Sequence, residues 1–185
     1  MEVYRNKSTI TNHYSLFVMK NCYSTQKINE IISTINGFPI EIDQEEIIEA
    51  RNFAILWPLF ENKICSRNCN YNTILKASKT LQICEEKLLP IWTFFCNRYL
   101  TDGKVNQNFT GLRLAKKLNE MRIIIETPNP SFKQQLFFCL YVVYRFRNNL
   151  FHGEKEPKQM WQQRDLFEQV NKLLIISIEA ITAAH

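Results

Sequence analysis

The fold is decided by residues 131–153, which read SFKQQLFFCLYVVYRFRNNLFHG. Ser131 is a suitable N-cap, and the stretch from Phe132 to Phe151 is apolar at nearly every turn of a helix. A helix that is apolar all round belongs inside a bundle, because no side of it favours contact with water. Gly153 is typical of the position that ends a helix. We therefore predict that this stretch forms the central core helix.

Apolar residues recur at helical spacing through most of the remaining chain, so we predict an all-α fold. Further helices are expected over residues 24–36, 44–65, 72–90, 112–125 and 159–183. The last of these should form a long C-terminal helical hairpin with the core helix, while residues 101–111 read as a polar surface loop. We expect a single domain over residues 1–185, with residues 1–40 as an N-terminal extension that carries the first helix and residues 41–183 as the helical core.

The composition excludes several classes of protein. With 45% hydrophobic residues the chain can bury one sizeable core, and its 4 glycines and 6 prolines are too few for the many turns of an all-β fold. No apolar run reaches the roughly 18 residues that a membrane span needs, because Arg145 and Arg147 interrupt the longest candidate. The N-terminus lacks the apolar core of a secretory signal. We expect a soluble, cytoplasmic protein with no membrane partner.

The six cysteines allow two interpretations. They could form three disulfides, but in a core-rich chain without an export signal we favour free thiols in a reducing compartment. Cys65 and Cys69 are four residues apart, whereas a structural zinc site needs four ligands in closely spaced pairs. The histidines that could join them are His13, His152 and His185. We expect neither a metal ion nor another cofactor.

Positive charge is concentrated in the part of the chain that holds the core helix. The formal net charge is +5, and residues 98–158 carry 11 basic and 5 acidic side chains, whereas residues 1–97 carry 10 of each. Such an excess suits a phosphate-rich partner, because basic side chains release counterions from a nucleic-acid backbone. An ordinary solvated basic face explains the charge equally well.

The end of the core helix presents two arginines, two asparagines and a histidine in a stretch otherwise built for burial. Such groups are costly inside a bundle unless they are paired or face a functional cleft. Asn148 and His152 are four residues apart, so the amide can orient the imidazole on one helix face. Arg147 is long enough to reach a phosphate held beside His152, and the negative end of the helix dipole favours the protonated imidazole. We take these three residues as the candidate catalytic group.

The run Arg147-Asn148-Asn149-Leu150-Phe151-His152 resembles the R-x4-6-H motif of the HEPN superfamily. The resemblance implies a HEPN-like helical bundle and a metal-independent endoribonuclease, whose composite site forms across a two-fold homodimer. It implies that His152 acts as general base or acid, that Arg147 stabilises charge on the phosphate, and that Asn148 positions His152 or the phosphate. The attacking group would be the ribose 2′-hydroxyl, so the expected substrate is RNA. Arg145 and Asn149 are the expected RNA-binding residues.

The same resemblance implies a toxin or antiviral defence effector that is restrained by an antitoxin or another defence partner. Some HEPN toxins carry a Tyr two residues after the His, which a partner modifies with AMP. This chain has Glu154 there, so that route of silencing is not expected. Three other interpretations stay open. In the first, the chain is a non-catalytic HEPN adaptor that assembles with a partner protein. In the second, it is a helical regulator with no nucleic-acid role. In the third, the motif is an ordinary helix end in which Arg147 forms a salt bridge and His152 caps carbonyl groups.

Overall fold

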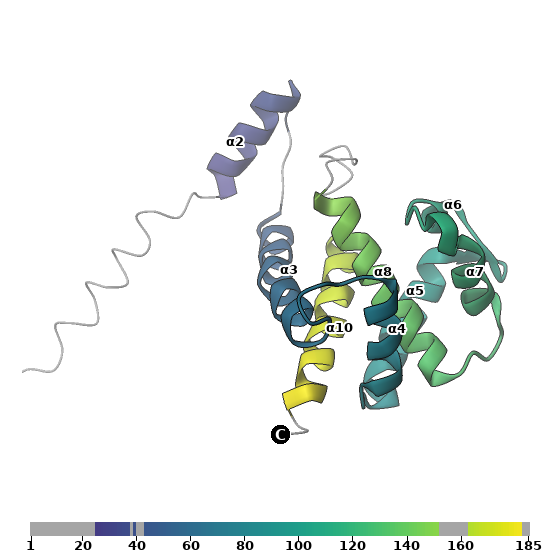
Figure 1. Cartoon of the computed structure of the whole chain (residues 1–185). Coiled ribbons are helices and arrows are strands. Elements are labelled where there is room, and N and C mark those ends of the chain that lie inside the picture. Colours follow the sequence, from purple (N-terminus) through teal and green to yellow (C-terminus); the bar gives the residue numbers. More distant parts are fainter. Residues whose placement is uncertain (1–24, 38, 40–42, 152–162, 183–185) are drawn as a thin grey trace, which may run out of the picture. The chain divides into compact units, whose positions relative to one another are not determined.

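The computed structural model describes residues 25–37, 39, 43–151 and 163–182 (Figure 1). Several residues singled out in the sequence lie outside the described residues, namely His13, Ser24, His152, Gly153, Glu154 and His185. The chain forms two compact units, Met1–Gln44 and Glu45–His185. The prediction of a single domain stays a prediction.

The first unit contains helix α2, Thr25–Asn36. The helix ends at Gly37, which has a φ of 73° and donates its N–H to the carbonyl of Ser33 (2.9 Å). This is a left-handed C-terminal cap, a conformation that glycine adopts without steric cost. The helix predicted over residues 24–36 is therefore confirmed from Thr25 onward.

The second unit is a helical bundle, which confirms the predicted all-α class. Its helices are α3 (Gln44–Lys63), α4 (Tyr71–Thr80), α5 (Glu85–Tyr99), α6 (Gln107–Thr110), α7 (Leu118–Glu126), α8 (Phe132–Phe151) and α10 (Arg164–Thr182). A two-stranded antiparallel hairpin joins β1 (Leu100–Thr101) to β2 (Lys104–Val105), and a short 3-10 helix, η1, covers Ala115–Lys117. None of the helices in the described ranges combines the length and the apolar character that crossing a membrane requires.

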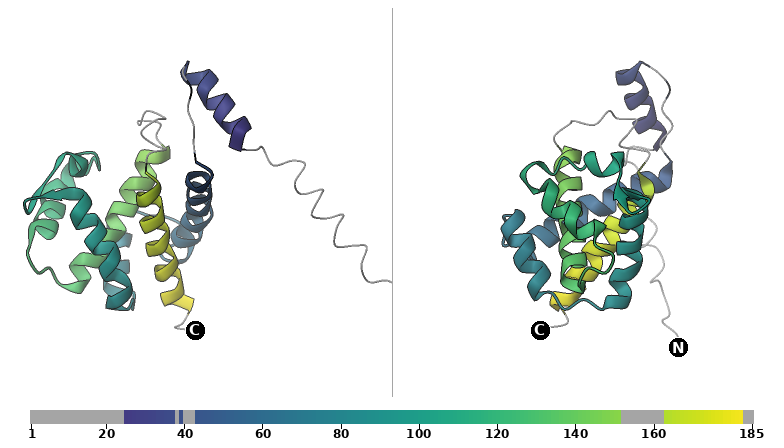
Figure 2. Two further views of the ribbon diagram at one scale, coloured as in Figure 1. Left: turned by 180° about the vertical axis from the view of Figure 1, so that it is seen from behind. Right: turned by 90° about the vertical axis from the view of Figure 1, so that its right-hand side faces the viewer.

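Helix α8 runs through the middle of this bundle (Figures 1 and 2) and packs against α4, α5, α7 and α10. Every residue from Leu136 to Val143 is buried, as its apolar character on all sides predicts. The helix begins with a capping box, in which the N–H of Ser131 donates to Oε1 of Gln134 (2.8 Å) and the N–H of Gln134 donates to Oγ of Ser131 (3.4 Å). Helix α10 runs beside it in the opposite direction (Figure 1), which is the predicted hairpin.

Three phenyl rings join α3, α8 and α10 near the end of α8. The ring of Phe146 meets Phe53 at 5.3 Å and Phe167 at 4.8 Å between centroids, both edge to face. None of the three residues is more than 3% exposed. Edge contacts of this kind contribute about 0.5–1.5 kcal/mol each beyond the burial of the rings. The cluster therefore fixes the last turns of α8 relative to its two neighbours.

The helix predicted over residues 72–90 is wrong in its extent, because α4 and α5 are separate helices. Between them, Leu81 and Ile83 are buried and the residue after each is exposed. This alternation is that of an extended segment, which brings both apolar side chains to the core. Pro90, which was expected to end the helix, lies inside α5.

The segment 101–111 is more ordered than the predicted loop. Asp102 and Gly103, with φ values of 51° and 72°, form the two-residue turn between β1 and β2. A type I′ hairpin turn requires positive φ at both of these positions, and Asp-Gly is one of its preferred sequences. The side chain of Asn106 then caps α6 by accepting the N–H of Phe109 (3.4 Å), whose ring is buried.

The helix predicted over residues 112–125 begins later than expected. Arg113 and Ala115 have φ values of 53° and 47°, which lie in the left-handed region that a right-handed helix excludes. The chain therefore passes through η1 before α7 begins at Leu118.

Candidate functional site

The predicted site lies at the end of α8, on residues Arg145 to Asn149, which we call the polar turn. Arg145, Arg147 and Asn148 are half-buried, whereas Asn149 is only 6% exposed. His152 was predicted to complete the catalytic group, and it lies outside the described residues. The geometry that follows is therefore that of the polar turn and its neighbours.

Arg147 and Asn148 interact with each other and with α3. Nη1 of Arg147 donates to Oδ1 of Asn148 (3.2 Å). The guanidinium carbon lies 5.7 Å from the centroid of the Trp57 ring, which is within the range of a cation–π contact. The indole Nε1 in turn donates to Oε2 of Glu61 (3.2 Å). Helix α3 thus supplies an aromatic face and a carboxylate behind the predicted catalytic arginine.

Arg145 and Asn149 are bound to a different part of the chain. Nε of Arg145 donates to the carbonyl of Leu112 (3.1 Å), and Nδ2 of Asn149 donates to the carbonyls of Gly111 (3.2 Å) and Leu112 (3.4 Å). These bonds tie the backbone between α6 and η1 to α8. These hydrogen bonds give both side chains a structural role. The predicted contact of Arg145 and Asn149 with RNA stays a prediction.

A pocket of about 420 Å³ opens beside Asn149. Its lining combines one guanidinium with several amides and comes from α5, α6, α8, the segment after α6 and the start of α10. The side-chain amide of Asn108 donates to the backbone carbonyl of Arg98 (3.2 Å), which ties α6 to the end of α5. The lining residues are Arg98, Tyr99, Gln107, Asn108, Gly111, Leu112, Phe146, Asn149, Gln163 and Leu166. Such a lining suits a ligand that accepts and donates hydrogen bonds.

Part of the positive charge predicted around the site is bound in local pairs. Nζ of Lys117 lies 3.1 Å from Oε2 of Glu120 and 3.5 Å above the ring of Tyr71. The hydroxyl of Tyr71 donates to Glu120 (2.6 Å), and this bond raises the pKa of the phenol. Tyr71 also packs edge-on against Tyr141 of α8, at 5.9 Å between centroids. Lys117 therefore contributes to the packing of α8 as well as to the surface charge.

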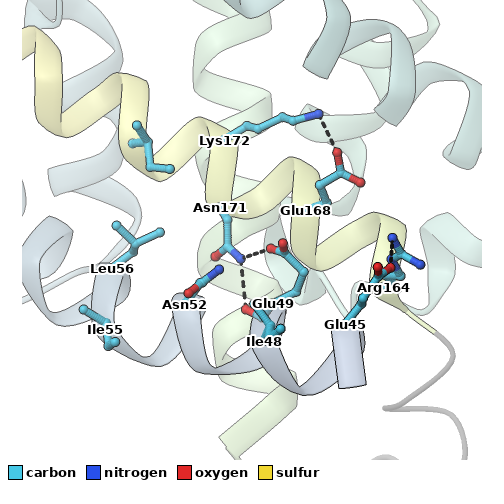
Figure 3. Close-up of a pocket in the computed structure, with 11 residues that line it drawn as sticks. Glu45, Ile48, Glu49, Asn52, Ile55, Leu56, Arg164, Glu168, Asn171 and Lys172 are labelled. Carbon is cyan, nitrogen blue, oxygen red and sulfur yellow. Dashed lines mark hydrogen bonds and ion pairs between the residues drawn. The ribbon is translucent and has the colours of Figure 1, made fainter. Parts of the chain in front are cut away.

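A larger pocket, of about 760 Å³, lies between α3 and α10 (Figure 3). Its lining includes no residue of the polar turn. Its lining carries three carboxylates, on Glu45, Glu49 and Glu168, against two cations, Arg164 and Lys172. A phosphate-rich ligand needs an excess of positive charge, so this pocket is not the candidate RNA site.

Sequence reasoning missed the place of Trp57 in the site. The Trp57 side chain is buried at 4% exposure, as an ordinary core residue would be. The structure also brings its ring to the guanidinium of Arg147. No local signal predicts this contact, because the two residues belong to helices that are far apart in the sequence.

Metal-ligating side chains are not gathered in the part of the chain that the structure describes. No group of three or more His, Cys, Asp or Glu residues there is arranged to hold a metal ion. The described cysteines, Cys65, Cys69, Cys84, Cys96 and Cys139, are free thiols, and Cys84 is exposed.

Comparison with models of protein families, with curated proteins and with solved structures finds no match to this chain. The function proposed below therefore rests on the chain's own residues and on the resemblance of its motif.

Proposed function

We propose that the chain is a metal-independent RNA endonuclease of the HEPN type. The observation that carries the proposal is the setting of Arg147 and Asn148. They are hydrogen-bonded to each other and half-buried over Trp57, at the end of a helix whose middle turns are buried. A guanidinium held in this way offers a planar fork of N–H donors that matches the oxygens of a phosphate.

The chemistry would be an internal transfer within the RNA strand. The ribose 2′-oxygen attacks the adjacent phosphorus and the 5′-oxygen leaves, which gives a 2′,3′-cyclic phosphate and a 5′-hydroxyl end. His152 takes the proton of the 2′-hydroxyl as general base, and the leaving 5′-oxygen takes a proton from water. Arg147 stabilises the charge that builds on the phosphate, and Asn148 positions the guanidinium. The need for a 2′-hydroxyl selects RNA over DNA.

The test is cleavage of a labelled RNA in the presence of EDTA. We expect the wild-type protein to cleave, and Arg147→Ala and His152→Ala to lose about 100-fold or more in rate. Arg51→Ala removes an exposed arginine of α3 and should leave the rate unchanged. Full activity in both motif variants, loss of activity on chelation, or products with 3′-hydroxyl ends would each contradict the mechanism.

A composite site makes a separate prediction about mixtures. If Arg147 and His152 act across a homodimer, mixing Arg147→Ala with His152→Ala protein should restore part of the activity, because mixed dimers contain one intact pair. Sedimentation measures the dimer directly. A strict monomer with full activity would contradict the composite site.

The toxin or defence role is tested in cells. Expression of the wild-type chain should slow growth and degrade RNA, and His152→Ala should do neither. A co-expressed antitoxin or defence partner should restore growth. Normal growth and intact RNA with the wild-type protein would contradict this role.

A non-catalytic adaptor is the second candidate, and exposed apolar side chains favour it. Ile55 of α3 is 58% exposed and Ile175 of α10 is 42% exposed, and both line the larger pocket. Exposed apolar groups that gather on one surface favour contact with another protein. An adaptor would leave RNA intact, and Ile55→Asp would release its partner in sedimentation.

A further inference from the structure

Two thiols lie next to each other behind the polar turn. The Sγ atoms of Cys65 and Cys69 are 2.8 Å apart. Both side chains are buried, with Cys65 at 1% and Cys69 at 9% exposure. Among the described cysteines this is the pair in hydrogen-bond contact, although all five are free thiols. The pair is therefore a specific arrangement rather than two separate buried cysteines.

The turn between α3 and α4 brings these thiols together. Ser66 and Arg67, between them, have φ values of 52° and 66°, which reverse the chain within five residues. The N–H of Asn68 donates to the carbonyl of Cys65 (3.1 Å), which closes the turn. Non-glycine residues with positive φ are uncommon and are held in place by the structure around them. The backbone is thus already shaped for contact between the two sulfurs.

The two thiols are not equivalent. The hydrogen bond from Cys69 lowers the pKa of Cys65, and a bond from Thr73 acts in the same direction, while burial and the charge of Glu61 oppose them. The pKa of Cys69 is raised, first by its bond to Cys65 and then by burial, although the charge of Arg147 opposes the rise. In contrast, burial raises the pKa of Cys96 to about 11, and it also raises that of Cys139. These pKa directions favour Cys65 as the nucleophile of the pair. Cys69 is then the thiol that attacks the Cys65 sulfur after it has been oxidised.

We propose that Cys65 and Cys69 form a redox site that a small hydroperoxide converts to an intramolecular disulfide. The sulfurs would have to approach by only about 0.8 Å to reach the roughly 2.0 Å of a disulfide bond. Because Cys65 is 1% exposed and Cys69 is 9% exposed, only an oxidant not much larger than water suits the site. This inference goes beyond the proposed ribonuclease activity and does not depend on it.

The reaction balances in two steps. The Cys65 thiol loses its proton, its sulfur attacks one peroxide oxygen and the O–O bond breaks. The leaving oxygen takes up that proton, which gives a sulfenic acid on Cys65 and an alcohol or water. The Cys69 sulfur then attacks the Cys65 sulfur, so that the S–S bond forms and the S–O bond breaks. The hydroxide leaves with the proton of Cys69 as water. The two thiols together lose two electrons, and the hydroperoxide is reduced by two.

The redox site shares a carboxylate with the candidate catalytic arginine. The backbone N–H of Cys69 donates to Oε1 of Glu61 (3.4 Å), and the other oxygen of Glu61 accepts from Trp57, over which Arg147 lies. A shift of Cys69 on oxidation would therefore move Glu61 and the Trp57 ring, and with them the guanidinium of Arg147.

The unsubstituted chain of 185 residues tests the proposal without any variant. The native chain is treated with hydrogen peroxide, denatured, alkylated without reductant and weighed, and it should carry two fewer alkyl groups than the six of the untreated protein. Trypsin cuts after Lys63, Arg67 and Lys76, so the disulfide should join the separate peptides 64–67 and 68–76. Reductant should release both peptides.

Variants make the site assignment specific. Cys65→Ser and Cys69→Ser should each abolish the linked peptides, whereas Cys84→Ser should leave them unchanged because Cys84 is exposed and lies in a different segment. Six alkyl groups after peroxide treatment, a link between other cysteines, or a sulfinic acid on Cys65 with Cys69 still free would each overturn the proposal.

Discussion

Asn148 and Asn149 are neighbours with the same side chain, and replacing each by alanine separates the two sides of the polar turn. Asn149 is buried and donates to two backbone carbonyls, whereas Asn148 is half-buried and accepts from Arg147. Alanine has the better helix propensity, and this gain is the same at both positions. The difference in the free energy of unfolding between the two variants therefore measures how much the buried amide of Asn149 stabilises the fold.

The expected difference follows from the hydrogen bonds. A bond of this kind contributes about 1 kcal/mol, and a buried carbonyl that loses its donor costs about 1–3 kcal/mol. The carbonyl of Leu112 keeps the bond from Arg145, so the loss at Asn149 falls mainly on Gly111. We expect Asn149→Ala to lower the free energy of unfolding by about 2 kcal/mol and the Tm by about 4–8 °C. Asn148→Ala should change the free energy by less than about 0.5 kcal/mol, because water can replace its bond.

Urea unfolding and calorimetry measure these changes, and RNA cleavage provides the second readout. Under the proposed function, Asn148→Ala lowers the cleavage rate of a stable protein, and Asn149→Ala keeps the rate at temperatures well below its Tm. Equal losses of stability in the two variants would refute the division of the polar turn into a structural and a functional side.

The remaining predictions concern packing, oxidation and pH. Phe146→Ala should cost about 3–5 kcal/mol in urea unfolding, because it removes the ring that joins Phe53 and Phe167, while Phe146→Leu should cost less than about 1.5 kcal/mol. A disulfide that closes the five residues from Cys65 to Cys69 should stabilise the fold by about 2 kcal/mol, seen as a Tm about 4–8 °C higher that falls again with reductant. The N–H of Val105 donates to Glu126 (3.1 Å) and, together with Lys104, lowers the pKa of that carboxyl. A lowered pKa means that this stabilisation is present above pH 4.5 and is lost as the pH falls through the folded pKa, so Glu126→Gln should flatten the acid side of the Tm profile.

Features that depend on neighbouring residues could be predicted from the sequence. Ser131 and Gln134 form their capping box from residues three apart, and α8 follows where the apolar pattern places it. The turn at Asp102 and Gly103 had a local signal too. The sequence nevertheless assigns these residues to a loop, because strands of two residues are too short to show the alternating pattern of a β-strand.

Features that depend on distant contacts could not be predicted. Leu81 and Ile83 fit the end of a helix as well as they fit an extended segment, and only their burial between α4 and α5 decides for the latter. The pairing of Arg145 and Asn149 on one helix face follows from their spacing. Their acceptors, the carbonyls of Gly111 and Leu112, come from a segment that the sequence does not connect with α8.

The contacts of Arg147 have an energetic consequence for the proposed reaction. A free arginine side chain carries about 2 kcal/mol of conformational entropy, which it loses when it binds a phosphate. Trp57 and Asn148 already restrict this side chain, so less remains to be lost when RNA binds. The restriction depends on the Trp57 indole, which Glu61 holds through one oxygen while its other oxygen accepts from Cys69. The oxidation state of the thiol pair and the order of the guanidinium are therefore linked through a single carboxylate, and a reagent that changes one should change the other.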